Sequence, residues 1–529
     1  MDGDGRAAIA RWEESRPGNV YDASPLLADG LRAHLGSDAL AELEPRLRAF
    51  GGAVATIVEP AVAAIESRHA TPGVDGDQRV RFDPEYAEAG RAVWVTGVVG
   101  APAFEQAALL YLLAQAGEGG HACPVVCTAR LVRALRRYGP DALRDRFLPP
   151  LLEPDYDRCD RGAQFLTEIQ GGSDVGANRV DAVPDGDAWR ISGEKWFCSV
   201  ADAEQFVVSA RPRGAPEGTR GIGCFLVPRE VDGAANGFRI QRLKDKLGTR
   251  VLATGEIEFD GALGYAIGAP EDGFRIAAGV VLNTSRWLNA LGSTGLMQRA
   301  YLEASSFARH RSAFGRPIAD FPLVRENLAL MKAEEHAALA STLELTALVA
   351  RIDDGTATDE DVAWHRVLVN ANKFVTSIAA TAVCRRGIEA LGGNGTIEDF
   401  SPLPRLWRDA IVFESWEGTH NVLCAQVLRD LGRLDALDVV LERVGDVETG
   451  DLGERLRRSL DDPRHGALHV RRQIETLVRA VQAVALRRLG RDAAAELLVR
   501  RRLSPGYDAE RDPEYPDLLD GVLGDDLRG

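Results

Sequence analysis

The spacing of apolar residues predicts a helical segment between Ala39 and Leu143. Leu109, Leu110 and Leu113 are spaced so that they line one face of a helix. Alternation of apolar and polar residues, which is typical of half-buried strands, is scarce in this segment. We therefore expect residues 1–160 to form a helical N-terminal domain.

Short apolar runs separated by turn-forming residues follow, from about Gly162 to Leu263. The runs AEQFVVSARP, GIGCFLVPRE and GEIEFDG alternate with groups such as Pro184-Asp185-Gly186. Runs of this length between Gly and Pro breaks are typical of strands joined by turns. We expect a central antiparallel β-domain over residues 161–268.

Helical periodicity returns after Gly273. One strongly apolar helix is expected around Leu323–Met331. A second runs from Asp361 to Leu391, where Gly392-Gly393 gives a helix-termination signal. These helices predict a C-terminal four-helix bundle over residues 269–433.

Residues 434–529 predict an additional C-terminal helical domain. A long helical pattern runs from about His469 to Arg502. The last part, Asp508–Gly529, is rich in Pro, Gly and Asp and is expected to be a loose tail. The expected fold class is therefore α+β, with helical, sheet and helical domains in that order.

Composition adds limits to this picture. A formal net charge of −16 disfavours nonspecific attraction of the whole molecule to nucleic acid or anionic lipid. The seven cysteines show neither a CxxC pair nor a disulfide framework, so no zinc site is expected. The N-terminal residues do not resemble a signal peptide, and no run of about 18 uninterrupted apolar residues occurs. These features predict a cytoplasmic protein without a membrane span.

Three segments contain residues suited to a nucleotide cofactor, although the chain has neither a G-x-G-x-x-G after a strand nor a P-loop. The first combines the Gly-rich stretch Phe165–Asp174 with Gly193–Ser199. Backbone N–H groups and the hydroxyls of Thr167 and Ser173 are suited to carbonyl or phosphate oxygens, and the pair Trp196-Phe197 is suited to a flat ring. Taken alone, a Gly-rich loop and two aromatic residues are more often a turn and core packing.

The second segment is RSAFGRPI, Arg311–Ile318. Arg311 offers planar donors suited to a pyrophosphate, and Phe314 offers a face for a base. A surface arginine and a packing phenylalanine would give the same pattern.

The third segment runs from Glu389 to Cys424 and contains EALGGNG, RLWRDA and SWEGTHNVLC. The glycines of Gly392–Gly395 permit close backbone approach to a ligand, and Thr419 is expected to cap a helix that begins near Asn421. Glu417 would then project from a loop at a helix N-terminus. It would serve there either as a reactive carboxylate or only as a charge that complements the helix dipole.

Together, TEIQGGSD, GEKWF, RSAFGRPI, EALGGNG and WEGT occur in this order across a helix, sheet, helix chain. In this the sequence resembles the acyl-CoA dehydrogenase superfamily over nearly its whole length. It is most similar to the longer, AidB-like branch, through LKDKLGTR, KWFCSV, LPRLWRD, WEGTHNVLCAQVLR and the additional C-terminal domain. The resemblance implies the acyl-CoA dehydrogenase fold and FAD as the cofactor.

By this resemblance, FAD lies between the β-domain and the C-terminal helical domain. Residues 164–173 and 197–199 would hold the isoalloxazine and ribityl parts, and Trp416–Cys424 would pass along the flavin. Arg311, Phe314 and the Gly392–Gly395 turn would reach the adenine half across a dimer, which implies a homotetramer built as a dimer of dimers. The implied cofactor-binding residues are Phe165, Leu166, Thr167, Gly172, Ser173, Trp196, Phe197, Cys198, Ser199, Arg311, Phe314, Gly392, Gly393, Trp416, Thr419 and Asn421.

The resemblance also implies a reaction. Glu417 matches the position of the family's catalytic base, which removes the α proton of an acyl thioester while the β hydride passes to flavin N5. An electron-transfer flavoprotein or oxygen would accept the electrons. No metal is expected.

Three departures from the family pattern leave the substrate open. Glu389 stands where the family has Gln, Thr396 follows GGNG where the family has Tyr, and Phe197-Cys198-Ser199 replaces Ile-Thr-Asn. A biosynthetic flavoenzyme acting on a carrier-bound or non-CoA substrate is therefore an alternative.

DNA is a further possible partner, because the AidB-like branch is associated with protection of DNA against alkylation. The segment Arg455–Arg502 holds thirteen arginines against five acidic residues. Arg472, Arg479 and Arg487 are spaced to lie on one helix side, as a phosphate-contacting surface would need. Solvated helix faces and subunit contacts give the same composition.

Overall fold

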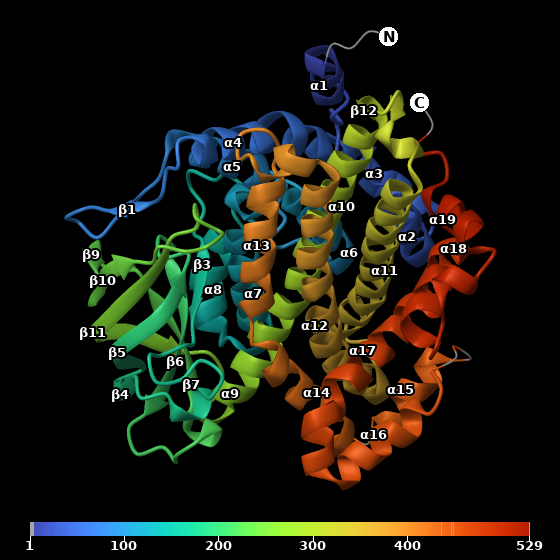
Figure 1. Cartoon of the computed structure of the whole chain (residues 1–529). Helices are drawn as coiled ribbons and strands as arrows, with labels where there is room; N and C mark the ends of the chain where they lie inside the picture. Colours follow the sequence, from blue (N-terminus) through green and yellow to red (C-terminus); the bar gives the residue numbers. More distant parts are fainter. Residues whose placement is uncertain (1–4, 435, 446, 448, 528–529) are drawn as a thin grey trace. The chain divides into compact units, whose positions relative to one another are not determined.

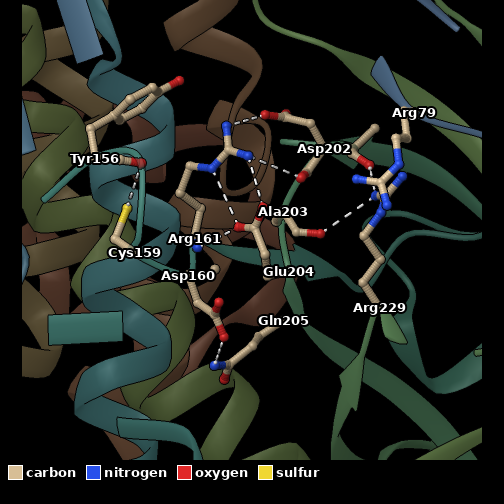
Figure 2. Close-up of polar contacts among 12 residues, drawn as sticks. Arg79, Tyr156, Cys159, Asp160, Arg161, Asp202, Ala203, Glu204, Gln205 and Arg229 are labelled. Atoms are coloured by element: carbon tan, nitrogen blue, oxygen red, sulfur yellow. Dashed lines mark hydrogen bonds and ion pairs between the residues drawn. The ribbon is translucent and has the colours of Figure 1, made fainter. Parts of the chain in front are cut away.

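The computed structural model describes residues 5–434, 436–445, 447 and 449–527 of the chain (Figure 1). The chain divides into two compact units. The sheet unit comprises residues 57–101 and 118–288. The helical unit comprises the described residues of 1–56, 102–117 and 289–529. Each unit thus combines segments that are far apart in the sequence.

The sheet unit contains a seven-stranded sheet. Its strands follow the order β10-β11-β5-β4-β6-β3, and β7 pairs with both β11 and β6. Most neighbours are antiparallel, as expected, but β3 and β4 each pair with β6 in parallel. The strands are β3 Gly162–Phe165, β4 Asp181–Asp185, β5 Ala188–Ser199, β6 Gln205–Pro212, β7 Gly223–Pro228, β10 Phe238–Leu243 and β11 Thr254–Ala266. Two short hairpins add β1 Gly73–Val74, β2 Val80–Arg81, β8 Glu230–Val231 and β9 Ala234–Ala235.

Helix α7 (Ala122–Tyr138) packs directly on this sheet. Its Leu131 and Leu135 share an apolar cluster with Val207 of β6. The Thr128 hydroxyl accepts a hydrogen bond from the Gly162 N–H at 2.9 Å, which joins the helix to the start of β3. The other α-helices of this unit are α4 Glu59–Ser67, α5 Pro84–Trp94, α8 Asp141–Leu152 and α9 Gly273–Ile276.

The helical unit is organised around α12, which packs against α11, α13 and α14. A capping box starts α12: the Thr358 hydroxyl accepts the Asp361 N–H at 3.1 Å, and the Asp361 carboxylate accepts the Thr358 N–H at 3.3 Å. The helices are α10 Asn283–His310, α11 Pro322–Asp353, α12 Asp359–Ala390, α13 Leu403–Ser415 and α14 His420–Arg433, preceded by α1 Gly5–Glu14, α2 Pro25–Leu35, α3 Ser37–Ala53 and α6 Ala103–Ala114.

The C-terminal helices correct two expectations. The single helix expected from His469 to Arg502 is interrupted, because Gly490 adopts a φ of 65° after α17 ends. The expected loose tail instead contains α19, which buries Leu519 and Leu523. These apolar side chains stabilise the segment against α11 and α18 despite its polar composition. The helices are α15 Leu437–Val444, α16 Leu452–Asp461, α17 Pro463–Arg488, α18 Asp492–Leu498 and α19 Tyr515–Leu523.

Within the part of the chain that the structure describes, two helical stretches, 37–67 and 359–390, are compatible with crossing a membrane by length and mean hydropathy. In the second stretch, 83% of the most apolar window is buried inside the protein, so its apolar character is explained by its place in the bundle core. The corresponding share for the first stretch is 39%.

The arginine-rich segment is largely neutralised by nearby carboxylates, and this corrects the expected phosphate-contacting stripe. Arg479 is only 4% exposed, and its guanidinium lies 2.6 Å from a Glu334 carboxylate oxygen on α11. Arg502 binds the same carboxylate at 2.8 Å. Within the described residues, eight of the thirteen arginines form ion pairs: Arg455, Arg457, Arg479, Arg488, Arg491, Arg500, Arg501 and Arg502.

We expect the Glu334 cluster to make unfolding pH-dependent. Burial alone would raise the pKa of Glu334, but Arg479 and Arg502 outweigh it and lower that pKa to about 2. A carboxylate with a depressed pKa stabilises the fold above its unfolded pKa and loses this contribution as pH falls toward the folded value. Glu334→Gln should therefore flatten the decline of the unfolding free energy between about pH 5 and pH 2 relative to the unaltered protein. Equal slopes for the two proteins would contradict this assignment.

Candidate active site

In the sheet unit, the TEIQGGSD loop is fixed to strand β5 by a buried ion pair. The Lys195 ammonium is 0% exposed and lies 2.7 Å from the Glu168 carboxylate. It also donates to the Leu166 carbonyl at 3.2 Å and the Ser209 hydroxyl at 3.1 Å. Burial lowers the pKa of Lys195, and Glu168 opposes that shift. A buried ammonium needs this full set of acceptors, which makes the pair specific to this loop conformation.

Glu168 also fixes the chain that follows the loop. Its carboxylate accepts backbone N–H groups from Arg179 at 2.6 Å and Val180 at 3.2 Å. The Trp196 N–H donates to the Thr167 carbonyl at 2.9 Å. The structure therefore brings two of the expected cofactor segments together within one unit. Glu168 and Lys195 stand inside the motifs TEIQGGSD and GEKWF, but the sequence assigned them no role. Residues of opposite charge in these two motifs were the available signal.

Two expected cofactor residues in this unit have side chains that face the sheet interior. Phe165 is fully buried, with its ring centroid 4.8 Å from that of Phe206. Cys198 is also fully buried, and burial raises its thiol pKa. Their backbone groups remain candidates for ligand contact, while their side chains are core. A register shift in the pairing of β5 with β11 lies beside Cys198, so simple alternation does not assign faces here.

The other expected residues of this unit lie nearer the surface. Leu166 is buried, Thr167, Trp196 and Ser199 are half-buried, and Gly172 and Ser173 are exposed. Phe197 is 54% exposed. The Lys244 ammonium, from LKDKLGTR, lies 3.5 Å from the Trp196 ring centroid and 4.9 Å from that of Phe197. A cation–π contact thus orients the aromatic pair, a role for Lys244 that the sequence alone did not indicate.

In the helical unit, the WEGT turn joins α13 to α14. Glu417 adopts the left-handed backbone conformation, with φ of 59°, and Gly418 follows with φ of 107°. The Trp416 ring stacks on Phe413, with centroids 4.7 Å apart. Thr419 occupies the N-cap position of α14, as expected, but its hydroxyl makes no capping hydrogen bond. Asn421 is exposed in the first turn of α14.

Contacts of Glu414 and His420 span the WEGT turn from both sides. The His420 Nε2 lies 2.9 Å from the Glu414 carboxylate, which also binds the Thr381 hydroxyl. The Lys373 ammonium donates to the Glu414 carbonyl at 2.8 Å. Burial raises the pKa of Glu414, but hydrogen bonds from His420 and Thr381 outweigh it, so the net shift is downward. Glu417 is therefore presented by a turn whose two ends are joined.

RSAFGRPI forms a two-residue hairpin between β12 Ser312–Ala313 and β13 Arg316–Pro317. Phe314 and Gly315 form its tip, with φ of 52° and 83°, as the right-handed twist of a tight hairpin favours. Phe314 is 97% exposed, and Arg311 is exposed beside it at the end of α10. Phe314 is thus an exposed aromatic side chain on a backbone conformation that non-glycine residues rarely adopt, in edge contact with Phe321 at 6.1 Å between ring centroids.

The EALGGNG segment ends α12 in a glycine turn. Gly392 adopts a φ of 61°, and both Gly392 and Gly393 are exposed. Gly395 is required for packing, since a Cβ there would lie 2.2 Å from the Ile388 carbonyl oxygen. The two exposed glycines are open to close approach by a ligand. Among the described residues, no group of three or more His, Cys, Asp and Glu side chains is arranged to hold a metal ion.

Comparison with known proteins identifies the family of this chain. The model of the acyl-CoA dehydrogenase middle domain matches residues 163–262, and that of the C-terminal domain matches residues 271–432. Glutaryl-CoA dehydrogenase of Desulfococcus multivorans is 30% identical over 296 residues, which are 55% of this chain and 70% of that protein. The chain belongs to the acyl-CoA dehydrogenase family. This confirms the expected family and the α+β fold class.

Within the acyl-CoA dehydrogenase family, the chain is similar to the AidB-like branch. The putative acyl-CoA dehydrogenase AidB of Escherichia coli (strain K12) is 35% identical over 350 residues, 63% of this chain and 61% of AidB. The chain thus spans less than two thirds of the length of that relative. The structure of Caenorhabditis elegans ACDH-11 in complex with C11-CoA matches with a TM-score of 0.82 at 26% identity, over 95% of this chain and 90% of that chain. An acyl-CoA dehydrogenase of Bacillus anthracis complexed with FAD matches with a TM-score of 0.71 at 19% identity, over 92% and 90% of the two chains.

Proposed function

We propose that this acyl-CoA dehydrogenase family member is an FAD-dependent oxidoreductase that forms an α,β double bond in an acyl thioester, with Glu417 as its catalytic base. The observation that carries the proposal is the backbone of Glu417. A non-glycine residue in the left-handed region costs about 1–2 kcal/mol and persists where the surrounding structure determines it, most often at functional sites. In this chain, the contact between Glu414 and His420 on either side of the turn and the stacking of Trp416 on Phe413 hold Glu417 in this conformation.

The residues present fit FAD. A flat ring needs an apolar face, and Phe197 offers a half-exposed one oriented by Lys244. A dinucleotide pyrophosphate and base need planar donors and an aromatic surface, and the exposed Arg311 and Phe314 provide both. The backbone N–H groups of the exposed glycine segments suit phosphate oxygens. When bound, FAD supplies the hydride acceptor of the reaction.

Glu417 would act as a proton acceptor at the α carbon of the thioester. Glu417 lies two positions before Thr419, the N-cap residue of α14, and a helix N-terminus favours a nearby negative charge. Gly418 follows with φ of 107°, a backbone conformation that residues with a side chain rarely adopt. The base and the hydride acceptor would act on adjacent carbons of one substrate, so each must be held in a defined position. The main contribution of the turn is therefore to position Glu417.

The partners follow from the same proposal. The substrate class is an acyl thioester, in keeping with the C11-CoA bound by the related ACDH-11, and an electron-transfer flavoprotein or oxygen would accept the electrons. The solvated Phe314 at the hairpin tip supports a role toward a neighbouring copy of the chain, and hence a dimer of dimers.

Anaerobic titration of the purified protein with a panel of acyl-CoAs tests this function. We expect flavin absorbance in the isolated protein and its bleaching by at least one thioester. Saturated acyl-CoAs of several chain lengths provide the panel, and the matching 2-enoyl-CoAs, which lack the α,β C–H pair to be oxidised, provide the control. A colourless protein would refute FAD binding, whereas a yellow protein that no thioester bleaches would refute the reaction alone.

A further inference from the structure

A groove with an apolar floor lies between α14, α16 and α17 of the helical unit. Its cavity measures about 560 Å³, within the range of roughly 300–1,000 Å³ typical of small-molecule sites. The apolar side chains that line it are Ala425, Leu428, Leu460, Ala467, Leu468 and Val470. Leu468 is 77% exposed at this groove.

The floor of the groove is held in place by close helix packing. A Cβ at Gly466 would lie 2.4 Å from the Ser459 carbonyl oxygen and 3.0 Å from Leu428 Cδ2, so only glycine permits this approach of α17 to its neighbours. The buried Ser459 hydroxyl donates to Gln473 Oε1 at 2.9 Å. The approach of α17 to α14 and α16 at the floor of the groove is therefore fixed by close packing.

Three arginines, Arg429, Arg433 and Arg471, also line the groove, and among the described residues no aspartate or glutamate does. Arg471 is positioned by two neighbours: its guanidinium lies 5.5 Å from the Phe374 ring centroid, and Nη1 lies 3.4 Å from Asn421 Oδ1. Three cations around an apolar floor, in a chain of net charge −16, give a local field that favours an anion.

A second cavity in the helical unit shows that arginines in a cavity lining do not by themselves produce an electrostatic field that favours an anion. It measures about 250 Å³ and is lined by Arg351, Arg443 and Arg488. Arg351 and Arg443 bind the Asp361 carboxylate at 3.0 and 3.2 Å, and Arg488 binds Glu344 at 2.9 Å. The arginines of that cavity are neutralised by the protein itself, whereas the lining of the larger groove supplies no carboxylate.

We propose that the groove between α14, α16 and α17 binds a medium-chain fatty carboxylate, with its alkyl chain on the apolar floor and its head group at Arg429, Arg433 and Arg471. A carboxylate matches the planar donor pairs of arginine, and an alkyl chain matches a floor of apolar side chains. The groove lining begins at Asn421 and Cys424, at the end of the segment expected to pass along the flavin, but Arg429, Arg433 and Arg471 lie beyond that segment, so the proposal does not depend on the proposed oxidation.

Calorimetric titration of the full-length protein with dodecanoate, below its micelle concentration, tests this site. We expect saturable binding that weakens by about tenfold or more in Arg429→Glu/Arg433→Glu, because the variant places two negative charges at the head group. Arg472→Glu is the matched control, since Arg472 is exposed on α17 outside the groove lining and should leave binding unchanged. Dodecan-1-ol, which has the same chain without the charge, should bind at least about tenfold more weakly than dodecanoate.

Hydrogen exchange locates the bound probe and separates this site from any acyl-binding region elsewhere. Dodecanoate should protect amides within residues 421–433 and 459–471, and this protection should disappear in Arg429→Glu/Arg433→Glu. Leu468→Asp, a change at an exposed position that leaves the fold intact, should abolish it independently. The proposal is overturned if dodecanoate binds equally to all variants, if dodecan-1-ol binds as well as dodecanoate, or if protection falls only outside these segments.

Discussion

Replacing Glu417 with glutamine is expected to lower the rate of flavin bleaching by acyl thioesters by about 10²–10⁴-fold, the usual contribution of a positioned general base. Glutamine keeps the size of the side chain and cannot accept the α proton. FAD content should be unchanged, because the expected cofactor contacts lie on other residues. The measurement is stopped-flow bleaching under anaerobic conditions, with FAD content determined from the same preparations. Glu442→Gln, an exposed carboxylate on α15, provides the matched control and should react like the unaltered protein.

Glu417→Gly gives a second arm to this experiment. Glycine adopts a φ of 59° without the penalty of a Cβ, so its free energy of unfolding should stay within about 1 kcal/mol of the unaltered protein or rise. Activity should fall as in Glu417→Gln. An active Glu417→Gly variant would show that the left-handed turn serves only the fold, and unaltered bleaching in Glu417→Gln would remove Glu417 as the base.

Breaking the buried ion pair of the sheet unit is expected to lower the free energy of unfolding by about 3–5 kcal/mol, the typical cost of leaving one buried charge unpaired. Lys195→Met leaves the Glu168 carboxylate without its ammonium, and Glu168→Gln leaves the Lys195 ammonium without its counter-charge. Either change should also reduce FAD retention, because the TEIQGGSD loop loses its anchor to β5. Chemical denaturation and the flavin-to-protein absorbance ratio measure the two effects.

The double variant Glu168→Gln/Lys195→Met should recover much of the lost stability, since it removes both buried charges together. Arg239→Met is the matched control in the same sheet: Arg239 of β10 pairs with Glu258 of β11 at the surface, with side chains 64% and 43% exposed, and its loss should cost at most about 1 kcal/mol. A double variant as unstable as the sum of the single ones would show that the two residues do not act as a pair.

The sequence alone predicted the order of elements and the segments that form the candidate site. Periodicity of 3.6 and 2 residues reports local geometry, so it identified the helices of the bundle and the strands of the sheet unit. The five motifs carried the family resemblance, and the family models confirm it over residues 163–262 and 271–432. Gly392 and Glu417 were recognised because glycine turns and helix starts have local signatures.

What depends on contacts between distant segments was decided only by the tertiary structure. The inward orientation of Phe165 and Cys198 depends on strand pairing and on a register shift, neither of which is visible in one strand. Arg479 has the composition of a surface residue, but a carboxylate on α11, well over a hundred residues earlier, takes it into the interior. The groove is likewise formed by three helices, α14, α16 and α17. Its positive charge depends on the fold, which brings three arginines to the lining and no aspartate or glutamate among the described residues. Local sequence patterns determine whether a segment is a helix, a strand or a turn. The burial of a residue and the net charge of a site depend on all the residues around them, and only the fold brings those residues together.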